Sequence, residues 1–452
     1  MSTDFSVDDK LGLLENTIDY FWTQFAGIVV LLMQLGFAFL EGGCVRYKNM
    51  QSIMIKVYLN TCIAIICWWL VGYGICMGHG QFAGTDYYAG SNFAGTKHYS
   101  HWVLQASVGA AANSIVSGGA VERMSIIGYC FLSVAFSSFI YPICAHWTWG
   151  GGWLQELGYI DLAGSGTIHF MSAVGALVLT IMLGARKNRW DEKYANDFNP
   201  SNTTYICLST LSLYTCWIFF NAGSTTALSG TMAYAAGRAT TNTMIAGASG
   251  GLTLMLLHYY KNRDEKAKFS LVMICNGNLA GLVAVTGSCD GIELWAAFVI
   301  GILGGLTYWA FGILIHKFKV DDPVDAFPIH GGCGLIGAQF PGWFNTEKGI
   351  LYGYGAKQWG IQLLGSVVWL GWSVVLHVVV IFLLKILGLL NVPPEVEEKG
   401  LDYAQCGGGG FDYQLLPPVL SSNGYDNVKS AINQKQDNIP QFGQENDQQQ
   451  VV

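Results

Sequence analysis

The sequence predicts an all-α integral membrane protein with eleven transmembrane helices. Its 452 residues are 52% hydrophobic and 12% charged, which is about half the charged share of a soluble globular protein. A bilayer core about 30 Å thick needs roughly 20 apolar residues for each spanning helix. Apolar windows of that length occur at 21–40, 57–77, 102–120, 126–149, 168–185, 204–226, 237–258, 270–288, 294–315, 327–345 and 361–384. This composition excludes a water-soluble enzyme.

The charges in the connecting loops predict the side of the membrane on which each loop lies. Loops that follow the first, third, fifth, seventh and ninth windows hold fourteen Lys and Arg residues, whereas the opposite loops hold four. Because cytoplasmic loops carry the excess of positive charge, the N-terminus is expected outside and the C-terminus in the cytoplasm. The chain then divides into an exoplasmic segment (1–20), a transmembrane domain (21–388) and a cytoplasmic tail (389–452) that becomes disordered toward its Gln/Asn-rich end.

Other residue types fit the same class. The net charge of −7 comes without a basic stripe, so nucleic acid is not expected as a partner. Most of the twelve cysteines fall inside apolar windows and are interpreted as small buried hydrophobes rather than as a disulfide framework. Four tryptophans within the windows are expected to face lipid or neighbouring subunits, namely Trp68, Trp69, Trp369 and Trp372.

Ionisable side chains at membrane depth are costly and are functional candidates for that reason. Four of the nine histidines lie inside windows: His146, His169, His330 and His377. Two of these share their surroundings, because an aspartate stands eight residues before each of them, Asp161 before His169 and Asp322 before His330. The two segments would cross the membrane in opposite directions. This indicates two inverted five-helix repeats, with one extra helix at the C-terminal end of the domain.

Glycines surround both histidines and would allow their helices to approach closely. They are Gly164, Gly166 and Gly175 near the first, and Gly331, Gly332, Gly334 and Gly337 near the second. Helix packing alone is one explanation of this density. The other is that the two imidazoles touch, so that each supplies the hydrogen-bond partner that a buried polar group needs.

Six short segments then occur in the order typical of one transporter family. They are Glu41–Asn49 (EGGCVRYKN), Ile115–Arg123 (IVSGGAVER), Ala145–Trp153 (AHWTWGGGW), Asp161–His169 (DLAGSGTIH), Trp217–Ser224 (WIFFNAGS) and Asp321–Gly332 (DDPVDAFPIHGG). On these motifs the chain resembles the ammonium transporter family (Amt, Mep and, more distantly, Rh proteins), and it is most similar to the Amt type. The resemblance covers about Phe21 to Gly407 and implies a homotrimer, with one pore in each subunit, in the plasma membrane.

The resemblance also implies roles for individual residues. Trp149 and Ser224 match the outer site that recruits ammonium, and Asp161 matches the aspartate that orders this site. His169 and His330 match the imidazole pair that lines the pore. Ammonium and methylammonium are the implied substrates, and neither a cofactor nor a metal is implied.

The chain departs from the family pattern at the outer gate and in the tail. Of the two stacked phenylalanines of the gate, the inner one matches Phe220, but the outer one falls on Val108. The segment Gly400–Gly407 resembles the cytoplasmic regulatory motif, but Cys406 replaces its histidine and Ala404 stands where plant members carry a regulatory threonine. A regulatory partner at the tail is therefore a further expectation, and its control by phosphorylation at position 404 is excluded.

Elementary chemistry explains why these residues suit ammonium. An indole face attracts a cation by about 0.5–2 kcal/mol, and a serine hydroxyl can accept one of its N–H groups. Carrying a bare cation through an apolar pore costs on the order of tens of kcal/mol, so splitting ammonium into NH₃ and a separately handled proton is favoured. Neutral imidazoles can pass that proton, whereas K⁺ has none to release. Both electrogenic transport and net NH₃ transport fit these residues.

Two other classes of function were weighed against transport. An intramembrane metalloenzyme would need His169, His330 and Asp161 as metal ligands, but the sequence holds no compact ligand set such as His-Glu-x-x-His. An ammonium sensor would signal through the cytoplasmic tail to a recruited protein, because the tail holds no recognisable output domain. The sequence therefore favours a transporter that is not an enzyme, with the sensor as the alternative.

Overall fold

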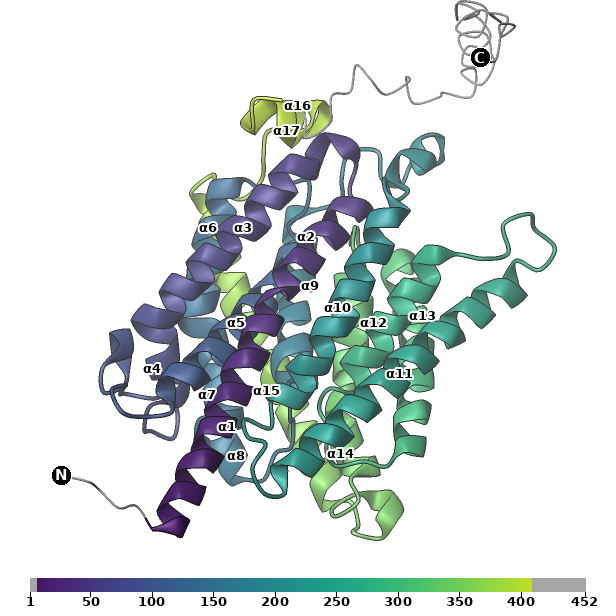
Figure 1. The fold of residues 1–452 in the computed structure, drawn as a ribbon. Helices are drawn as coiled ribbons and strands as arrows, with labels where there is room; N and C mark the ends of the chain where they lie inside the picture. Colours follow the sequence, from purple (N-terminus) through teal and green to yellow (C-terminus); the bar gives the residue numbers. More distant parts are fainter. Residues whose placement is uncertain (1–5, 409–452) are drawn as a thin grey trace, which may run out of the picture.

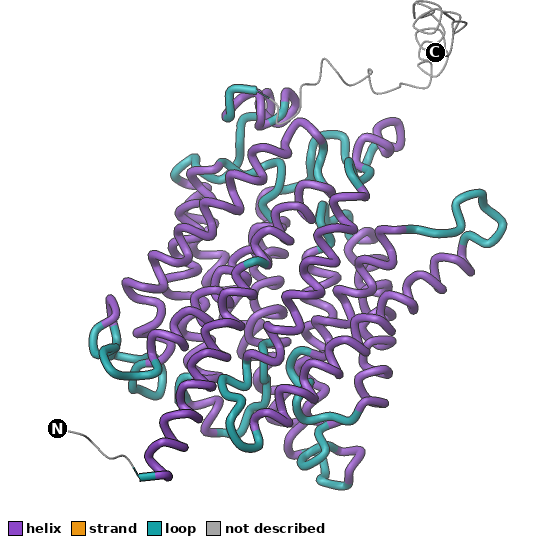
Figure 2. Tube along the Cα trace, viewed as in Figure 1, coloured by secondary structure: helices purple, strands orange, loops and turns teal. Residues whose placement is uncertain are grey.

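The computed structural model describes residues 6–408. Within that range the chain is helical and contains no strand (Figure 2). The helices are α1 (Val7–Leu31), α2 (Met33–Cys44), α3 (Met50–Cys67), α4 (Tyr73–Met77), α5 (His98–Gly118), α6 (Ile126–Ala135), α7 (Tyr141–Trp149), α8 (Trp153–Glu156), α9 (Met171–Leu183), α10 (Thr203–Gly223), α11 (Met232–Lys261), α12 (Leu271–Val285), α13 (Leu294–Lys317), α14 (Cys333–Phe344), α15 (Lys357–Ile386), α16 (Pro394–Lys399) and α17 (Leu401–Gln405).

Four π-helical turns widen these helices locally. They are η2 (Trp68–Gly72) between α3 and α4, η4 (Phe136–Ile140) between α6 and α7, η5 (Ser165–Phe170) before α9, and η7 (Phe327–Gly332) before α14. Such turns are rare and occur frequently at functional sites. Short 3₁₀ turns lie in the loops, at η1 (Tyr47–Asn49), η3 (Tyr88–Gly90), η6 (Glu192–Phe198) and η8 (Ile350–Tyr352).

Each of the eleven predicted windows falls on a helical segment. Seven segments of residues 6–408 are long and apolar enough to cross a membrane, at Val7–Cys44, Tyr47–Met77, Ile126–Glu156, Ser165–Leu183, Thr203–Gly223, Leu294–Lys317 and Lys357–Ile386. The prediction of an all-α membrane protein is confirmed at this level. The structure adds that α1 begins earlier than the first window, because Ser6 and Asp9 form a capping box at its N-terminus.

The helices pack into one bundle whose two ends differ (Figure 1). The N-terminal end of α1 lies at one end, and α16 and α17 lie at the other. Loops with basic residues gather at the tail end, since Arg46, Arg123 and Arg186 converge there on shared acidic partners. At the centre of the bundle, α5 is buried continuously from Leu104 to Gly118. This stretch buries polar side chains as well as small apolar ones, so the helix meets neighbouring helices on every side.

The expectation that four tryptophans face lipid or other subunits is wrong for two of them. Trp68 and Trp369 are 1% and 0% exposed. Trp68 packs on Tyr141, and Trp369 donates a hydrogen bond from Nε1 to the hydroxyl of Tyr159 at 3.2 Å. These indoles lie between helices that cross inside one subunit, an arrangement that composition alone does not indicate.

Candidate functional site

A cavity of about 200 Å³ opens at the end of the bundle opposite the tail. Its lining comes chiefly from the first turns of α5, the end of α7 and the residues that follow α10. The predicted recruitment residues Trp149 and Ser224 and the predicted gate residue Val108 all line it. The other lining residues are His101, Leu104, Gln105, Gln155, Leu162, Ala163, Ile168 and Thr226. The structure thus brings together the three side chains that the motifs placed in the outer site.

Asp161 orders this site without lining the cavity. Its backbone carbonyl accepts a hydrogen bond from Nε1 of Trp149 at 2.9 Å, which fixes the indole plane. Its carboxylate is 3% exposed and accepts the N–H groups of Gly164, Gly166 and Thr167 and the hydroxyl of Thr167, at 2.9 to 3.1 Å. The side chain of Asp161 therefore caps the start of η5, and its backbone carbonyl positions the tryptophan.

The serine and the inner gate residue are linked along α10. The Ser224 hydroxyl donates to the carbonyl of Phe220 at 2.8 Å, one turn earlier, so its lone pairs remain as acceptors. Phe220 is 1% exposed, and its ring lies 5.9 Å from the ring of His169. Phe220 therefore lies on the side of Ser224 that faces the histidine pair. Val108, which lines the cavity, supplies a smaller apolar side chain at the expected position of the outer gate residue.

His169 and His330 are in contact at the centre of the bundle. Their Nδ1 atoms are 3.3 Å apart, and their rings are stacked with centroids 5.2 Å apart and planes 18° apart. Both are buried, at 2% and 5% exposure. Nε2 of His169 has no hydrogen-bond partner within residues 6–408. Apart from each other, the rings meet mainly aromatic side chains, so they form a polar pair in apolar surroundings.

Trp217 holds the histidine pair and was not assigned a role from the sequence. Its ring stacks on His169 at 4.9 Å, and its Nε1 donates to the hydroxyl of Thr286 at 2.8 Å. Phe37 of α2 lies 6.4 Å from the ring of His330 on the other side. Phe37 lies in a predicted window without any local pattern that marks it, whereas Trp217 opens the motif Trp217–Ser224 but received no role from it.

The shared Asp-to-His spacing has a common geometry. His169 lies in η5 and His330 in η7, each at the start of its helix. Asp161 accepts the backbone N–H five residues later, that of Gly166, at 3.0 Å. Asp322 likewise accepts the N–H of the residue five positions on, Phe327, at 2.8 Å. Each aspartate thus caps the π-helical turn that carries the histidine.

Close approach of the two turns depends on glycine. A Cβ atom on Gly334 would lie 2.7 Å from the carbonyl oxygen of Ser165 and 2.8 Å from the amide nitrogen of Phe170, both backbone atoms of η5. These backbone atoms cannot move out of the way as the end of a flexible side chain can. A side chain at position 334 would therefore push η5 and α14 apart and separate the two histidines.

Replacement of Gly334 by valine is expected to destabilise the protein by about 1–3 kcal/mol, the usual cost of overpacking a core, and to lower uptake of labelled methylammonium. The thermal unfolding midpoint of the purified protein in detergent measures the first effect. Gly371→Val in α15 is the control, because no atom lies within 4 Å of a Cβ built there. Equal losses in both variants would contradict the close-approach argument.

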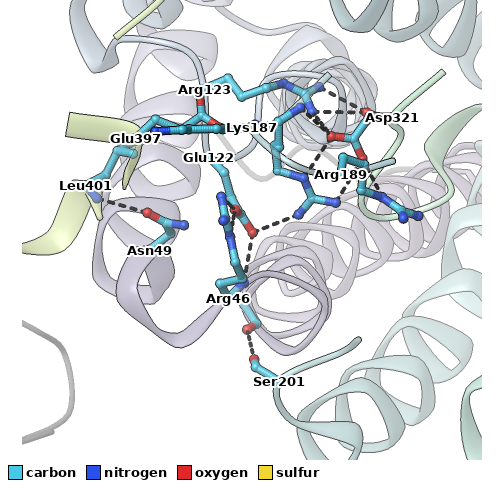
Figure 3. Close-up of polar contacts among 12 residues, drawn as sticks. Arg46, Asn49, Glu122, Arg123, Lys187, Arg189, Ser201, Asp321, Glu397 and Leu401 are labelled. Atoms are coloured by element: carbon cyan, nitrogen blue, oxygen red, sulfur yellow. Dashed lines mark hydrogen bonds and ion pairs between the residues drawn. The ribbon is translucent and has the colours of Figure 1, made fainter. Parts of the chain in front are cut away.

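At the tail end of the bundle, acidic residues of two loops bind arginines of three loops, one of which also carries Glu122 (Figure 3). Asp321 is 3% exposed and forms ion pairs with Arg123, Arg186 and Arg189 at 2.8 to 3.1 Å. Glu122 is 1% exposed and pairs with Arg46 at 2.5 Å and with Arg186 at 3.0 Å. Arg186 bridges the two carboxylates. The cluster ties the loops between helices of both halves of the chain.

This cluster predicts a pH dependence of stability. Burial alone would raise the pKa of Asp321, but hydrogen bonds and charges from Arg186 and Arg123 outweigh burial and lower that pKa to about 2 from its ordinary value of 3.8. A lowered pKa stabilises the folded state above the ordinary value, and this stabilisation, about 2 kcal/mol, is lost as the pH falls from about 4 to about 2. The unfolding midpoint of Asp321→Asn should lie below that of the wild type at neutral pH and converge with it near pH 2. A difference that stays constant with pH would contradict this assignment.

The first part of the tail packs against the same end. The carboxylate of Asp402 accepts the N–H groups of Gln51 and Ser52 at 2.9 and 2.8 Å, which caps the N-terminus of α3. The N–H of Leu401 donates to the Asn49 side chain at 2.9 Å (Figure 3). Lys187 forms an ion pair with Glu398 at 2.8 Å. The Gln/Asn-rich run that was expected to be disordered lies outside the described residues.

Known proteins share this sequence and this fold. Residues 21–411 match the sequence profile of the Ammonium Transporter Family. Ammonium transporter 3 of Dictyostelium discoideum is 32% identical over 422 residues, which cover 88% of this chain and 95% of that protein. Ammonium transporter Amt2 of Archaeoglobus fulgidus is 31% identical over 86% of this chain and 87% of its own.

Solved structures of related proteins share the fold of this chain. A protein described as Sensor Amt Protein superimposes with a TM-score of 0.80 at 31% identity, covering 87% of this chain and 99% of that one. Mep2 of Saccharomyces cerevisiae superimposes with a TM-score of 0.76 at 26% identity, covering 83% and 89%. The relatives are transport proteins rather than enzymes. With six motifs, a profile match along most of its length and this shared fold, the chain belongs to the ammonium transporter family.

Proposed function

We propose that the protein recruits ammonium at Trp149 and Ser224, removes a proton from it, and conducts NH₃, with a separately handled proton, along a pore lined by His169 and His330. The observation that carries this proposal is the buried imidazole pair, with Nδ1 atoms 3.3 Å apart and Nε2 of His169 without a partner among the described residues. A buried polar pair of this kind is costly in a membrane protein and needs a functional reason.

Recruitment follows from the wall of the outer cavity. The fixed indole of Trp149 offers a π face to a cation, worth about 0.5–2 kcal/mol. The Ser224 hydroxyl already donates a hydrogen bond to the carbonyl of Phe220. Toward the cavity it can therefore only accept a hydrogen bond. Ammonium has four N–H donors and no acceptor. The cavity therefore favours a small cation with hydrogen-bond donors over one without them.

Beyond the cavity, the apolar surroundings favour the uncharged form. A bare cation next to Phe220, Trp217 and the two imidazoles would lose its hydration without a counter-charge, at a cost on the order of tens of kcal/mol. Ammonia avoids that cost if its proton is left behind or passed on. K⁺ has no such route, so selectivity against K⁺ comes from proton chemistry rather than from pore width.

The contact between the two rings sets how they handle a proton. Across an Nδ1 to Nδ1 hydrogen bond, one neutral imidazole donates and the other accepts, so their Nε2 atoms have opposite roles. One end of the pair can therefore accept a hydrogen bond from ammonia while the other donates one. When Nε2 of the donor ring takes up a proton, the shared proton can move to the acceptor ring, and that ring then releases the proton on its own Nε2. Both rings are neutral again with their roles exchanged, which gives a relay without a permanently charged histidine.

We also propose the finer architecture. Eleven helical crossings, as two inverted five-helix repeats and one further helix, would place the N-terminus outside and the tail in the cytoplasm, with 1–20, 21–388 and 389–452 as the three regions. The capped η5 and η7 support the repeat, and the arginine-rich end beside the tail supports the orientation. A homotrimer in the plasma membrane, with a regulatory partner at the tail, completes this proposal. Transport is favoured over sensing because the curated relatives quoted above are named as transporters.

Uptake of labelled methylammonium by cells that lack their own ammonium uptake tests this function. The proposal predicts saturable uptake that excess ammonium suppresses and excess K⁺ does not. Uptake at the level of cells without the protein, with the protein present at the surface, would contradict it.

A further inference from the structure

The outer cavity has a polar wall that the family motifs do not account for. His101 and Gln105 lie four residues apart on α5 and both line the cavity. Residues at this spacing project from the same face of a helix. Val108, where the outer gate phenylalanine is expected, follows one turn further along the same face. The smaller valine thus sits beside two side chains that can form hydrogen bonds.

Gln105 presents an acceptor that the protein leaves unused. The side chain is 8% exposed, and its Oε1 atom is buried without a hydrogen-bond partner in the described part of the chain. An unsatisfied buried acceptor of this kind costs about 1–3 kcal/mol. A donor that enters the cavity would remove that cost.

His101 is oriented by a tyrosine of another helix. The hydroxyl of Tyr73 in α4 lies 2.8 Å from Nδ1 of His98 and 3.4 Å from Nδ1 of His101. The Tyr73 hydroxyl has one proton, which it donates to the nearer nitrogen, Nδ1 of His98. Nδ1 of His101 therefore carries its own proton and donates it in a hydrogen bond to the tyrosine oxygen. Nε2 of a neutral His101 is then the unprotonated acceptor, and residues 6–408 give it no partner.

We propose that His101 is a substrate-binding residue, and that its Nε2 atom and Oε1 of Gln105 accept N–H hydrogen bonds of ammonium in the outer cavity. This inference rests on the proposed function. Together with Ser224 they supply three acceptors for a cation that has four donors and needs no aromatic side chain at position 108. Tyr73 acts as a positioning residue, since it sets which nitrogen of His101 carries the proton.

The experiment compares uptake of ammonium and of methylammonium at neutral pH for the wild type, His101→Leu, His101→Gln, His98→Leu and His79→Leu. Loss of one hydrogen bond to a charged group is expected to raise KM for ammonium about tenfold in His101→Leu, with Vmax per surface molecule unchanged. Methylammonium has only three N–H donors, so its KM should rise less. His101→Gln restores a neutral acceptor and should recover most of the affinity. His98→Leu should raise KM as well, because the Tyr73 hydroxyl is then free to donate to Nδ1 of His101 and the imidazole proton moves to Nε2. His79→Leu is the matched control, because His79 pairs with Asp86 and does not line the cavity.

A KM in His101→Leu equal to that of the wild type, or a rise of the same size in His79→Leu, would overturn the inference while wild-type uptake leaves the proposed function intact. Absence of saturable uptake in the wild type would overturn both. If His101→Leu does not reach the surface, Gln105→Leu serves as the second variant, with a raised KM expected and an unchanged KM contradicting the proposal.

Discussion

Replacement of His169 by leucine is expected to lower ammonium uptake at least about a hundredfold, while the protein still reaches the membrane. Leucine fills a similar volume but neither donates nor accepts a proton, and positioned acid–base groups contribute about 10²–10⁴ in rate. His330→Leu should have a similar effect, because the relay needs both rings. The initial rate of uptake, divided by the amount of protein at the surface, measures the loss.

His377→Leu provides the matched control for these variants. His377 is also fully buried, hydrogen bonds through Nδ1 to the carbonyl of Ser373 at 2.8 Å, and has an Nε2 atom without a partner among residues 6–408. It lies on α15 and does not contact the histidine pair. Its variant should keep most of the wild-type uptake. A His169→Leu protein that transports ammonium as fast as His377→Leu and still excludes K⁺ would rule out the relay.

Asp161→Ala is expected to have the largest effect on stability together with a loss of recruitment. The substitution leaves three backbone N–H groups without their acceptor inside the protein, and the Thr167 hydroxyl keeps only its contact with Thr148. At about 1–3 kcal/mol for each unsatisfied buried donor, the cost reaches about 4 kcal/mol or more. The start of η5 would loosen, and the indole of Trp149 would lose its fixed plane. Thermal unfolding in detergent and the KM for methylammonium measure the two effects.

Thr167→Val supplies a milder member of the same series. It removes one of the four donors to Asp161 and the contact with the Thr148 hydroxyl at 2.8 Å, but it keeps the size of the side chain. A cost of about 1–2 kcal/mol is expected, with a smaller rise in KM. If Asp161→Ala unfolds at the same temperature as Thr167→Val, the carboxylate does not organise this turn in the way described.

Much of the fold follows from the sequence because the membrane requires every spanning helix to be apolar over roughly 20 residues. Each of the eleven apolar windows falls on a helical segment, seven of which are long and apolar enough to cross a membrane. Glycine density near His169 and His330 indicated that their helices approach closely. An apolar residue can face either lipid or a neighbouring helix, because both surroundings exclude water. Its apolar character alone therefore does not show which of the two it contacts. Trp68 and Trp369 were assigned to the surface for that reason and lie in the core.

The site was predictable where a residue type is rare at membrane depth, and not where contacts cross between distant segments. His169 and His330 stand out as buried histidines. Trp217 does not, because a tryptophan in an apolar window has many explanations. The Tyr73 contact with His101 joins α4 to α5 across a loop whose course no spacing rule gives. The arginine cluster around Asp321 likewise joins loops that are 132 to 198 residues apart.

Voltage-clamp recording from oocytes that express the protein tests the central claim most directly, when ammonium, methylammonium and K⁺ are applied in turn and labelled methylammonium uptake is followed in parallel. The account predicts saturable uptake of methylammonium that ammonium competes for, with no current carried by K⁺. An inward current with ammonium would add that the proton crosses with its substrate, and its absence would indicate net NH₃ transport. A K⁺ current as large as the ammonium current, with both histidines intact, would contradict selection by proton chemistry.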